Sequence, residues 1–236
     1  MKPKLRTLRQ RIHNLLNSKT VVLDGVRLNA QASLVGTDVR TEMIRGSYEF
    51  AERKLLLSCL QPGDRVVEIG AGVGAIGLVA ANAVGAANVV SYEANPDLEL
   101  VIRGNHKLNN LAPKLVMKAV TVAGGSVDFY VAKSLLSSSL HSRGEHTVRT
   151  VESEAFDLII AEESPSVLVL DVEGAEVELL KNAKLEGIRA LLIEMHPNVV
   201  GEEAIEGLEA YLKSVGFSKV QTLHRNMLLE RRGMCG

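Results

Sequence analysis

The sequence predicts an α/β protein with a doubly wound, mostly parallel sheet. Short apolar segments alternate along the chain with segments of helical periodicity, and a glycine-rich turn follows the first buried strand of that series. Such alternation is typical of parallel sheets with helices on both faces. The chain has 236 residues, of which 46% are hydrophobic and 23% charged, so it is long enough for one such domain with its own core.

The expected elements follow this alternation from residue 61 onward. Strands are predicted at residues 65–69, 88–92, 114–120, 127–131, 167–172 and 190–195. Helices are predicted at residues 75–84, 97–110, 176–183 and 202–215. Residues 217–223 and 227–230 are expected to end the chain as an antiparallel pair, and the Ser- and His-rich segment 134–150 to form a loop near the site.

An extension over residues 1–60 is expected to precede this main domain at residues 61–236. It begins with a basic amphipathic helix that lacks acidic residues. That helix either contacts an anionic surface or a second subunit, or packs on the domain with a solvated basic face. A strand or hairpin arm is predicted at residues 21–29, and a helix at 48–60 that ends at the turn Gln61-Pro62-Gly63-Asp64.

Composition excludes several classes of protein. A net charge of -1 argues against wholesale nucleic-acid binding, which requires a basic surface. No apolar run approaches the length of a transmembrane helix, and the N-terminus lacks the apolar centre of a signal peptide. Of the two cysteines, Cys59 is expected to be a packed thiol and Cys235 to lie in a mobile tail, which indicates a reducing compartment and a cytoplasmic protein.

The glycine-rich turn spans Glu68 to Gly77. Glycines there allow a strand to turn sharply into a helix and let a ligand approach the backbone, at a helix N-terminus that suits an anionic group. One frame, Gly72-Val73-Gly74-Ala75-Ile76-Gly77, fits the dinucleotide pattern of an NAD(P)-dependent oxidoreductase. The other frame begins at the acid, with Glu68 followed by Gly70, Ala71, Gly72 and Gly74.

Glu68 distinguishes these two frames. A carboxylate would repel a pyrophosphate, whereas S-adenosylmethionine carries a positive sulfonium and ammonium that would compensate a buried Glu. The sequence therefore favours the methyl donor as the cofactor, and a third interpretation is that Glu68 only binds backbone N–H groups of its own turn. Glu93, at the end of the next strand, is expected to accept hydrogen bonds from ribose hydroxyls in either frame. Asn105 and Asn109 are expected to be solvated or capping residues.

A second group of acids follows the apolar strand 167–172. Asp171 and Glu173 alternate at the carboxyl end of this strand, where open α/β sheets bind ligands. Glu176 falls in the first turn of the next helix, where the helix dipole favours it. One strand later, His196 is a candidate general base near neutral pH, although a lone His at a strand end is more often structural.

These residues carry a resemblance to a known family. The turn from Val66 to Gly74 with Tyr92-Glu93-Ala94-Asn95-Pro96, the segment from Leu170 to Glu176, and Ile193-Glu194-Met195-His196 resemble the FkbM family of class I S-adenosylmethionine-dependent methyltransferases. The resemblance covers about Gly46 to Pro197, and it implies a seven-stranded Rossmann-like sheet. By analogy with a family segment, Tyr48 and Glu49 are expected to close over the amino-acid end of the donor. Ala94 and Asn95 complete the expected cofactor contacts, with Asp171.

The resemblance also implies O-methylation of a hydroxyl on a small molecule or sugar. Two departures weaken that transfer of substrate class: glycine at Gly72 replaces the family's usual Asn, and Ala94 replaces its usual Pro. For an oxygen acceptor, His196 and Asp171 are the candidates for proton removal. A divalent-ion site at Asp171, Glu173 and Glu194 is the alternative. Spacing alone does not establish that their oxygens converge, so no metal is predicted. A non-catalytic nucleoside-binding module remains open.

Overall fold

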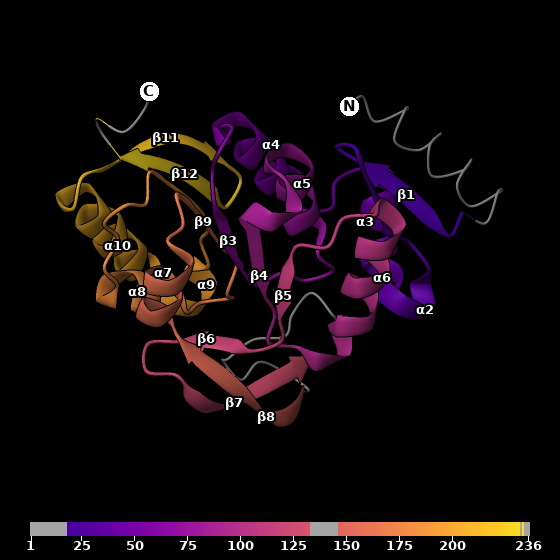
Figure 1. Ribbon diagram of the computed structural model, residues 1–236. Coiled ribbons are helices and arrows are strands. Elements are labelled where there is room, and N and C mark those ends of the chain that lie inside the picture. Colours follow the sequence, from indigo (N-terminus) through magenta and orange to yellow (C-terminus); the bar gives the residue numbers. More distant parts are fainter. Residues whose placement is uncertain (1–17, 133–145, 232, 234–236) are drawn as a thin grey trace.

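The computed structural model describes residues 18–132, 146–231 and 233, and it has a central sheet with helices packed on both faces (Figure 1). The basic helix predicted at the N-terminus and Cys235 lie outside the described residues. The central sheet has the strand order β11-β12-β10-β9-β3-β4-β5. Its strands are β3 (Val66–Ile69), β4 (Val89–Tyr92), β5 (Lys114–Val116), β9 (Val167–Leu170), β10 (Ala190–Glu194), β11 (Phe217–Leu223) and β12 (Asn226–Arg231).

The sheet is mixed rather than wholly parallel. The strands β10, β9, β3, β4 and β5 pair in parallel. At one edge β12 runs antiparallel to β10 and to β11, which confirms the predicted antiparallel strands at the end of the chain. Because the parallel strands share one direction, the carboxyl ends of β3, β4, β9 and β10 meet at one edge of the sheet.

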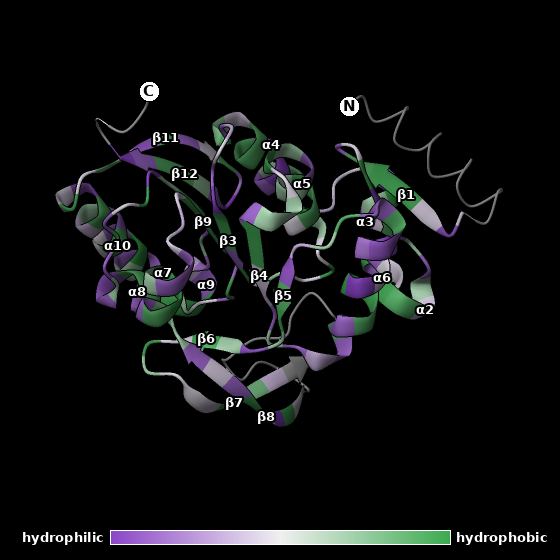
Figure 2. Ribbon diagram, in the orientation of Figure 1, coloured by the Kyte–Doolittle hydropathy of each residue, from purple (hydrophilic) through white to green (hydrophobic). Residues whose placement is uncertain are grey.

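The central strands β3, β4 and β9 are buried along their whole length and mostly apolar, because helices cover both faces (Figure 2). Along β9, Val167 and Val169 pack in one core, whereas Leu168 and Leu170 pack in the other. The first core includes residues of α4 (Phe50–Cys59), α5 (Ala75–Val84) and α6 (Glu99–Asn109). The second includes residues of α7 (Phe156–Glu163), α8 (Glu176–Asn182) and α10 (Glu202–Ser214). Single-turn helices are η1 (Ala86–Asn88), η2 (Pro96–Leu98) and α9 (Pro197–Val200).

A separate three-stranded sheet corrects two predictions. The strand predicted at 114–120 is two strands, because β5 joins the central sheet while β6 (Ala119–Thr121) pairs with β8 (His146–Ala155). The loop predicted at 134–150 is wrong for residues 146–150, which belong to β8 and pair antiparallel with β7 (Gly125–Ala132). The rest of that segment lies outside the described residues. Helix α7 was not predicted, although Phe156, Ile159 and Ile160 are buried at helical spacing.

The described part of the extension packs on the main domain. The predicted hairpin is β1 (Thr20–Leu23) with β2 (Val26–Asn29), followed by α2 (Ala32–Val35) and α3 (Thr37–Arg45). Asn105 is fully buried, which corrects the prediction of a solvated or capping residue. Its amide accepts from the Asn29 N–H at 2.7 Å and donates to the Val73 carbonyl at 2.8 Å. Asn109 bonds the backbone of Arg27 in the same way, so α6 supplies the partners that the edge strand β2 lacks.

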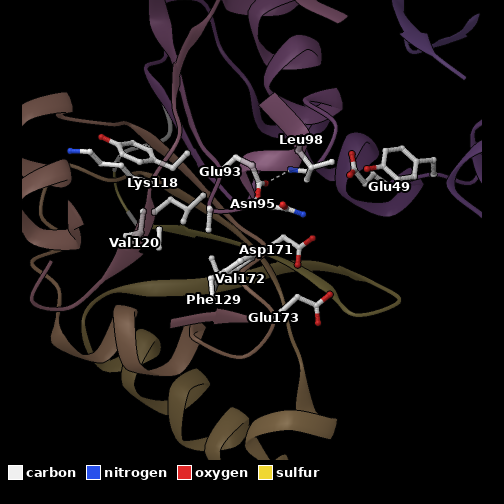
Figure 3. A pocket seen from close by; sticks show the side chains of 17 residues that line it. Glu49, Glu93, Asn95, Leu98, Lys118, Val120, Phe129, Asp171, Val172 and Glu173 are labelled. Carbon is white, nitrogen blue, oxygen red and sulfur yellow. Dashed lines mark hydrogen bonds between the residues drawn. The ribbon is translucent and has the colours of Figure 1, made fainter. Parts of the chain in front are cut away.

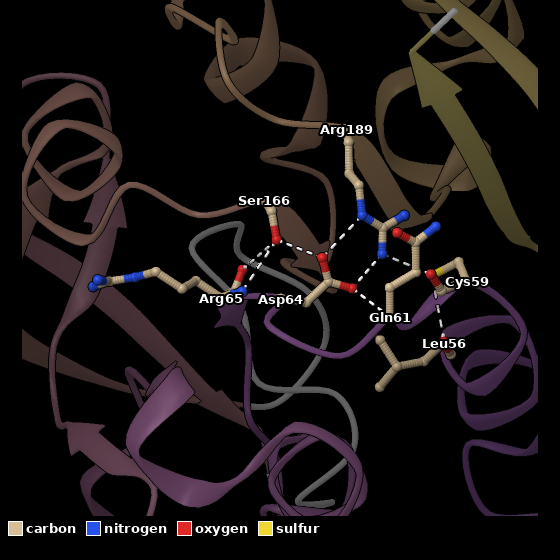
Figure 4. Close-up of polar contacts among 7 residues, drawn as sticks. All are labelled: Leu56, Cys59, Gln61, Asp64, Arg65, Ser166 and Arg189. Atoms are coloured by element: carbon tan, nitrogen blue, oxygen red, sulfur yellow. Dashed lines mark hydrogen bonds and ion pairs between the residues drawn. The ribbon is translucent and has the colours of Figure 1, made fainter. Parts of the chain in front are cut away.

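A buried ion pair fixes the end of α4 (Figure 4). The Arg189 guanidinium donates to both oxygens of Asp64 and, at 2.7 Å, to the carbonyl of Cys59, the last residue of α4. Ser166 donates to Asp64 at 2.7 Å. Cys59 is buried, as predicted. The network joins α4 to the starts of β3, β9 and β10, and it thereby holds the acidic residues of α4 in place at the opposite end of those strands.

Candidate active site

A pocket with about 750 Å³ of open space lies at the carboxyl ends of β3, β4 and β9 (Figure 3). Its lining includes most of the residues predicted to bind the cofactor: Tyr48, Glu49, Gly70, Gly72, Glu93, Ala94, Asn95 and Asp171. Glu68, Ala71 and Gly74, which were also predicted, lie outside the lining.

The glycines of the turn answer different steric demands. A Cβ at Gly70 would lie 1.8 Å from the carbonyl oxygen of Asp171, so this glycine lets the loops after β3 and β9 cross. At Gly72 the backbone has φ +56, and a Cβ would approach the Tyr48 hydroxyl at 3.3 Å on the pocket wall. At Gly77 a Cβ would lie 2.5 Å from Glu68 Oε2, so a larger residue there would displace the buried carboxyl. Only Gly70 and Gly72 of these three line the pocket.

Glu68 points beneath α5. Its Oε1 accepts from the Gly77 N–H at 3.0 Å, and burial raises the pKa of the carboxyl to about 8 against the opposing effect of the Ser91 and Gly77 contacts. The side chain is 2% exposed and is absent from the pocket lining. In this geometry the carboxyl ties the strand to its own helix, which is the contact that the third interpretation describes.

Glu93 closes the other side of the turn. The Gly72 N–H donates to its Oε2 at 2.8 Å, and the Asn95 N–H donates to its Oε1 at 2.7 Å. Burial raises the pKa of Glu93 to about 7, against these backbone hydrogen bonds, which favour the charged form. The Ala94 and Ala71 N–H groups also favour the charged form, and the carboxylate lines the pocket. Glu93, which the sequence predicts to contact the ribose, therefore lies on the wall of the pocket.

His196 links the acids that follow β9 and β10. Its Nδ1 donates to Glu176 Oε1, which is fully buried and also accepts from the Gly174 N–H at 3.0 Å. Its Nε2 lies 3.7 Å from Asp171 Oδ1 and 3.7 Å from Glu173 Oε2. Glu176 was predicted only to support the helix dipole. Its contact with His196 corrects that interpretation, because it fixes the orientation of the imidazole ring.

The charge of this group is shared among its members. Burial lowers the pKa of His196, but the hydrogen bond to Glu176 and the charges of Asp171 and Glu173 outweigh it and raise the pKa to about 9. Burial, together with the charge of Glu194, raises the pKa of Asp171 well above its usual range. His196 is 4% exposed and is not part of the lining, whereas Asp171 and Glu173 are. In Figure 3 these two carboxylates lie close together below Glu93 and Asn95.

Tyr48 and Glu49 form the wall opposite. Glu49 is not a glycine yet has φ +46, a left-handed conformation that the surrounding structure must support. Burial raises the pKa of Glu49 to about 8. Glu173 has the same kind of backbone, with φ +52. Two strained carboxylates on one pocket are typical of a functional site.

Sequence reasoning missed the apolar wall of the pocket and one acid behind it. The apolar wall comes from η2 and from the three-stranded sheet, through Leu98, Val120 and Phe129. The missed acid is Glu52, which is 3% exposed. A sequence signal for it exists, since Glu52 falls on the apolar stripe of α4 formed with Leu55, Leu56 and Cys59.

A parallel sheet with a glycine-rich turn and an acid at the end of the next strand defines the class of nucleoside-binding α/β enzymes. Residues 68–219 match the model of the methyltransferase FkbM domain. The chain belongs to the FkbM methyltransferase family, and it is an S-adenosylmethionine-dependent methyltransferase. This finding supports the predicted methyl donor over the dinucleotide frame and the enzyme over the non-catalytic module.

Solved structures resemble the chain only distantly. Magnesium protoporphyrin IX methyltransferase from Synechocystis PCC 6803 has 14% identity and a TM-score of 0.46, over 83% of this chain and 84% of that chain. A ribosomal protein L11 methylase from Lactobacillus delbrueckii subsp. bulgaricus has 13% identity and a TM-score of 0.43, over 77% and 76%. A search of curated proteins gives no match. Within the described residues, every helix is too short or too polar to cross a membrane.

The pocket residues fit S-adenosylmethionine. Three buried polar atoms on the lining have no hydrogen-bond partner among the described residues: Glu49 Oε2, Asn95 Nδ2 and Asp171 Oδ1. The donor offers an ammonium and a sulfonium, which suit the carboxylates, and adenine nitrogens, which suit the amide. A buried polar atom without a partner is costly, so such atoms indicate where a ligand completes the structure.

Proposed function

We propose that this methyltransferase transfers the methyl group to the oxygen of a hydroxyl on a small molecule or sugar. The observation that carries the proposal is the Asp171–His196–Glu176 chain, in which a pocket-lining carboxylate is backed by an oriented imidazole. A hydroxyl is a poor nucleophile until its proton is removed, and a chain of this kind removes protons.

In this proposal the bound donor supplies an activated methyl group on a sulfonium. As the acceptor oxygen forms its bond to the methyl carbon, the carbon–sulfur bond breaks and its electron pair stays on sulfur, which becomes neutral. The hydroxyl proton passes to Asp171 at the pocket wall, and the charge of His196, whose Nε2 lies 3.7 Å from Asp171 Oδ1, acts on that carboxylate. Positive charge entering the pocket lowers the pKa values of Asp171 and His196, and this leaves the group able to accept that proton.

The remaining pocket residues hold the donor in line with the acceptor. Glu93 accepts from the ribose hydroxyls, and Asn95 donates to the adenine. Glu49 and Asp171 face the positive amino-acid end, while Tyr48 packs beside Gly72. Leu98, Val120 and Phe129 supply an apolar wall that excludes water. Glu68 contributes indirectly, by holding α5 against β3. Positioning of this kind supplies much of the barrier reduction for a two-substrate displacement.

The test is turnover with a methyl-labelled donor and a panel of alcohol, sugar, phenol and amine acceptors. The expected result is label on oxygen, with kcat at saturating donor reduced at least about 100-fold in Asp171→Asn. Label found on nitrogen or carbon would refute the oxygen assignment. Full activity of Asp171→Asn would refute the role of the carboxylate.

A cytoplasmic location is also proposed. Cys59, among the described residues, is a free and buried thiol. This supports the reducing compartment inferred from the cysteine content.

A further inference from the structure

Glu52 lies on α4 behind the pocket, and the described structure gives its carboxyl no favourable partner. The side chain is 3% exposed, and no hydrogen bond or ion pair reaches it from the residues that the structure describes. Burial and the charges of Glu49, Asp171, Glu68 and Glu194 all act against its ionised form. A cation bound beside this carboxyl would remove most of the cost of ionising it.

The Glu52 carboxyl points toward two others at the carboxyl ends of strands. Ligand oxygens of Glu52, Asp171 and Glu194 all lie within 4.8 Å of one another. They come from three elements distant in sequence, α4, the end of β9 and the end of β10. We propose that Glu52, Asp171 and Glu194 form a binding site for a hard divalent cation, of the Mg²⁺ or Mn²⁺ kind, directly behind the methyl-donor pocket.

The geometry suits one ion. With metal–oxygen distances of about 2.0–2.6 Å, two oxygens bound to the same ion lie roughly 3–5 Å apart. The three carboxylates satisfy this without a change of fold. Oxygen ligands from carboxylates select Mg²⁺, Ca²⁺ or Mn²⁺ over softer metals.

His196 completes the surroundings of the site. Its Nε2 lies 3.7 Å from Asp171 Oδ1 and 4.0 Å from Glu194 Oε1, and its Nδ1 is held by Glu176. A carboxylate on the far nitrogen of a His is the usual support of a metal-binding imidazole. A second group, Asp171, Glu173 and His196, satisfies the same 4.8 Å criterion. His196 is thus placed to be a further ligand of the ion.

Basic side chains do not fill this role in the described residues. Arg53 is the nearest basic residue in sequence to Glu52, and its guanidinium donates instead to Asp24 and to the carbonyls of Tyr48 and Gly46. The recorded ion pairs of Asp171 and Glu194 are both with His196. Glu49 and Glu68 are two further carboxyl groups on the same side. A bound divalent cation would stabilise the ionised form of all these groups.

The function of this ion deepens the proposed function and rests on it. Asp171 belongs both to the ion site and to the pocket lining, so a cation there lies next to the acceptor position. Its charge lowers the pKa of a nearby hydroxyl and offsets the carboxylates that face the donor. The ion can bind without activating the acceptor hydroxyl, so ion binding is tested separately from methyl transfer.

The experiment measures Mn²⁺ binding to the full chain after removal of metal with a chelator, by calorimetry and by electron paramagnetic resonance of free Mn²⁺. We expect one Mn²⁺ per chain, with competition by Mg²⁺. Glu52→Gln keeps the shape of the side chain but removes one ligand charge, and it is expected to weaken binding at least about tenfold. Glu194→Gln is expected to act alike. The matched control is Glu206→Gln, an exposed acid on α10, which is expected to leave binding unchanged.

Three outcomes overturn the proposal: no saturable Mn²⁺ binding to the wild-type chain, equal binding in a folded Glu52→Gln variant, or equal weakening by Glu206→Gln. Melting curves of all variants establish that they fold. S-adenosylmethionine binding is measured on the same metal-free samples. Donor binding without Mn²⁺ binding refutes only the ion site, and Mn²⁺ binding without donor binding refutes only the donor pocket.

Discussion

Replacement of Glu93 by Gln gives the most direct test of the donor pocket. The carboxylate holds the turn through the N–H groups of Gly72 and Asn95, and it lines the pocket. Gln has the same shape but no charge, and one of its two terminal atoms is a donor. That donor must face either a backbone N–H or a ribose hydroxyl. The variant therefore loses charge-assisted hydrogen bonds in a buried place while it keeps its packing.

The magnitude follows from the contacts. A hydrogen bond to a charged group contributes about 1.5–3 kcal/mol. Replacing the two hydrogen bonds between the Glu93 carboxylate and the ribose hydroxyls by weaker, neutral ones therefore costs about 2–4 kcal/mol of donor binding, or roughly 30- to 1,000-fold in Kd. The assay is calorimetric titration with S-adenosylmethionine, with Glu206→Gln as the control. A Kd within twofold of the wild-type value, in a variant with an unchanged melting temperature, would refute the ribose assignment.

Three further predictions concern pH and packing. Because the pKa of Glu93 is raised to about 7 and the donor selects the ionised form, donor affinity should fall about tenfold from pH 8 to pH 6; Glu93→Gln should reduce this dependence. Burial raises the pKa of Glu68 from 4.5 to about 8, so the unfolded chain loses this proton first and the free energy of unfolding declines from about pH 4.5 to 8. In urea titrations, Glu68→Gln should make the loss of unfolding free energy between about pH 4.5 and pH 8 smaller by up to about 5 kcal/mol. A variant that loses as much unfolding free energy as the wild type over this range would contradict the raised pKa of Glu68. Gly70→Ala places a Cβ against the Asp171 carbonyl, whereas Gly187→Ala has a similar φ, +87 against +92, and open space. Gly70→Ala should lower the free energy of unfolding by at least about 2 kcal/mol more than Gly187→Ala does. Equal losses in the two variants would show that backbone strain at positive φ, and not the clash with the Asp171 carbonyl, destabilises Gly70→Ala.

Much of the candidate site could be predicted because parallel strands bring their carboxyl ends to one edge. Glu93 and Asp171 each end such a strand or follow it directly, and both line the pocket. Glu68 also lies in such a strand, yet it points beneath α5, because Gly77 leaves space for it there. The strand pattern predicts which residues lie at the ends of the strands, but it does not predict which helix packs over each side chain.

Long-range partners could not be predicted in this way. His196 and Glu176 are separated by 20 positions, and their contact joins the first turn of α8 to the segment that follows β10. Glu52 and Glu176 both occupy apolar stripe positions of their helices. A charged residue on an apolar stripe is therefore the sequence signal for these two buried acids, although it does not identify their partners.

The sequence by itself determined the alternation of strands and helices, the glycine-rich turn and the acids at strand ends. These features depend on local periodicity and on backbone conformations that glycine allows. Only the tertiary structure decided the split between β5 and β6, the burial of Asn105, and the convergence of Glu52, Asp171 and Glu194. The reason is physical: burial and charge compensation depend on packing between segments far apart in the chain, and no local pattern encodes those distances.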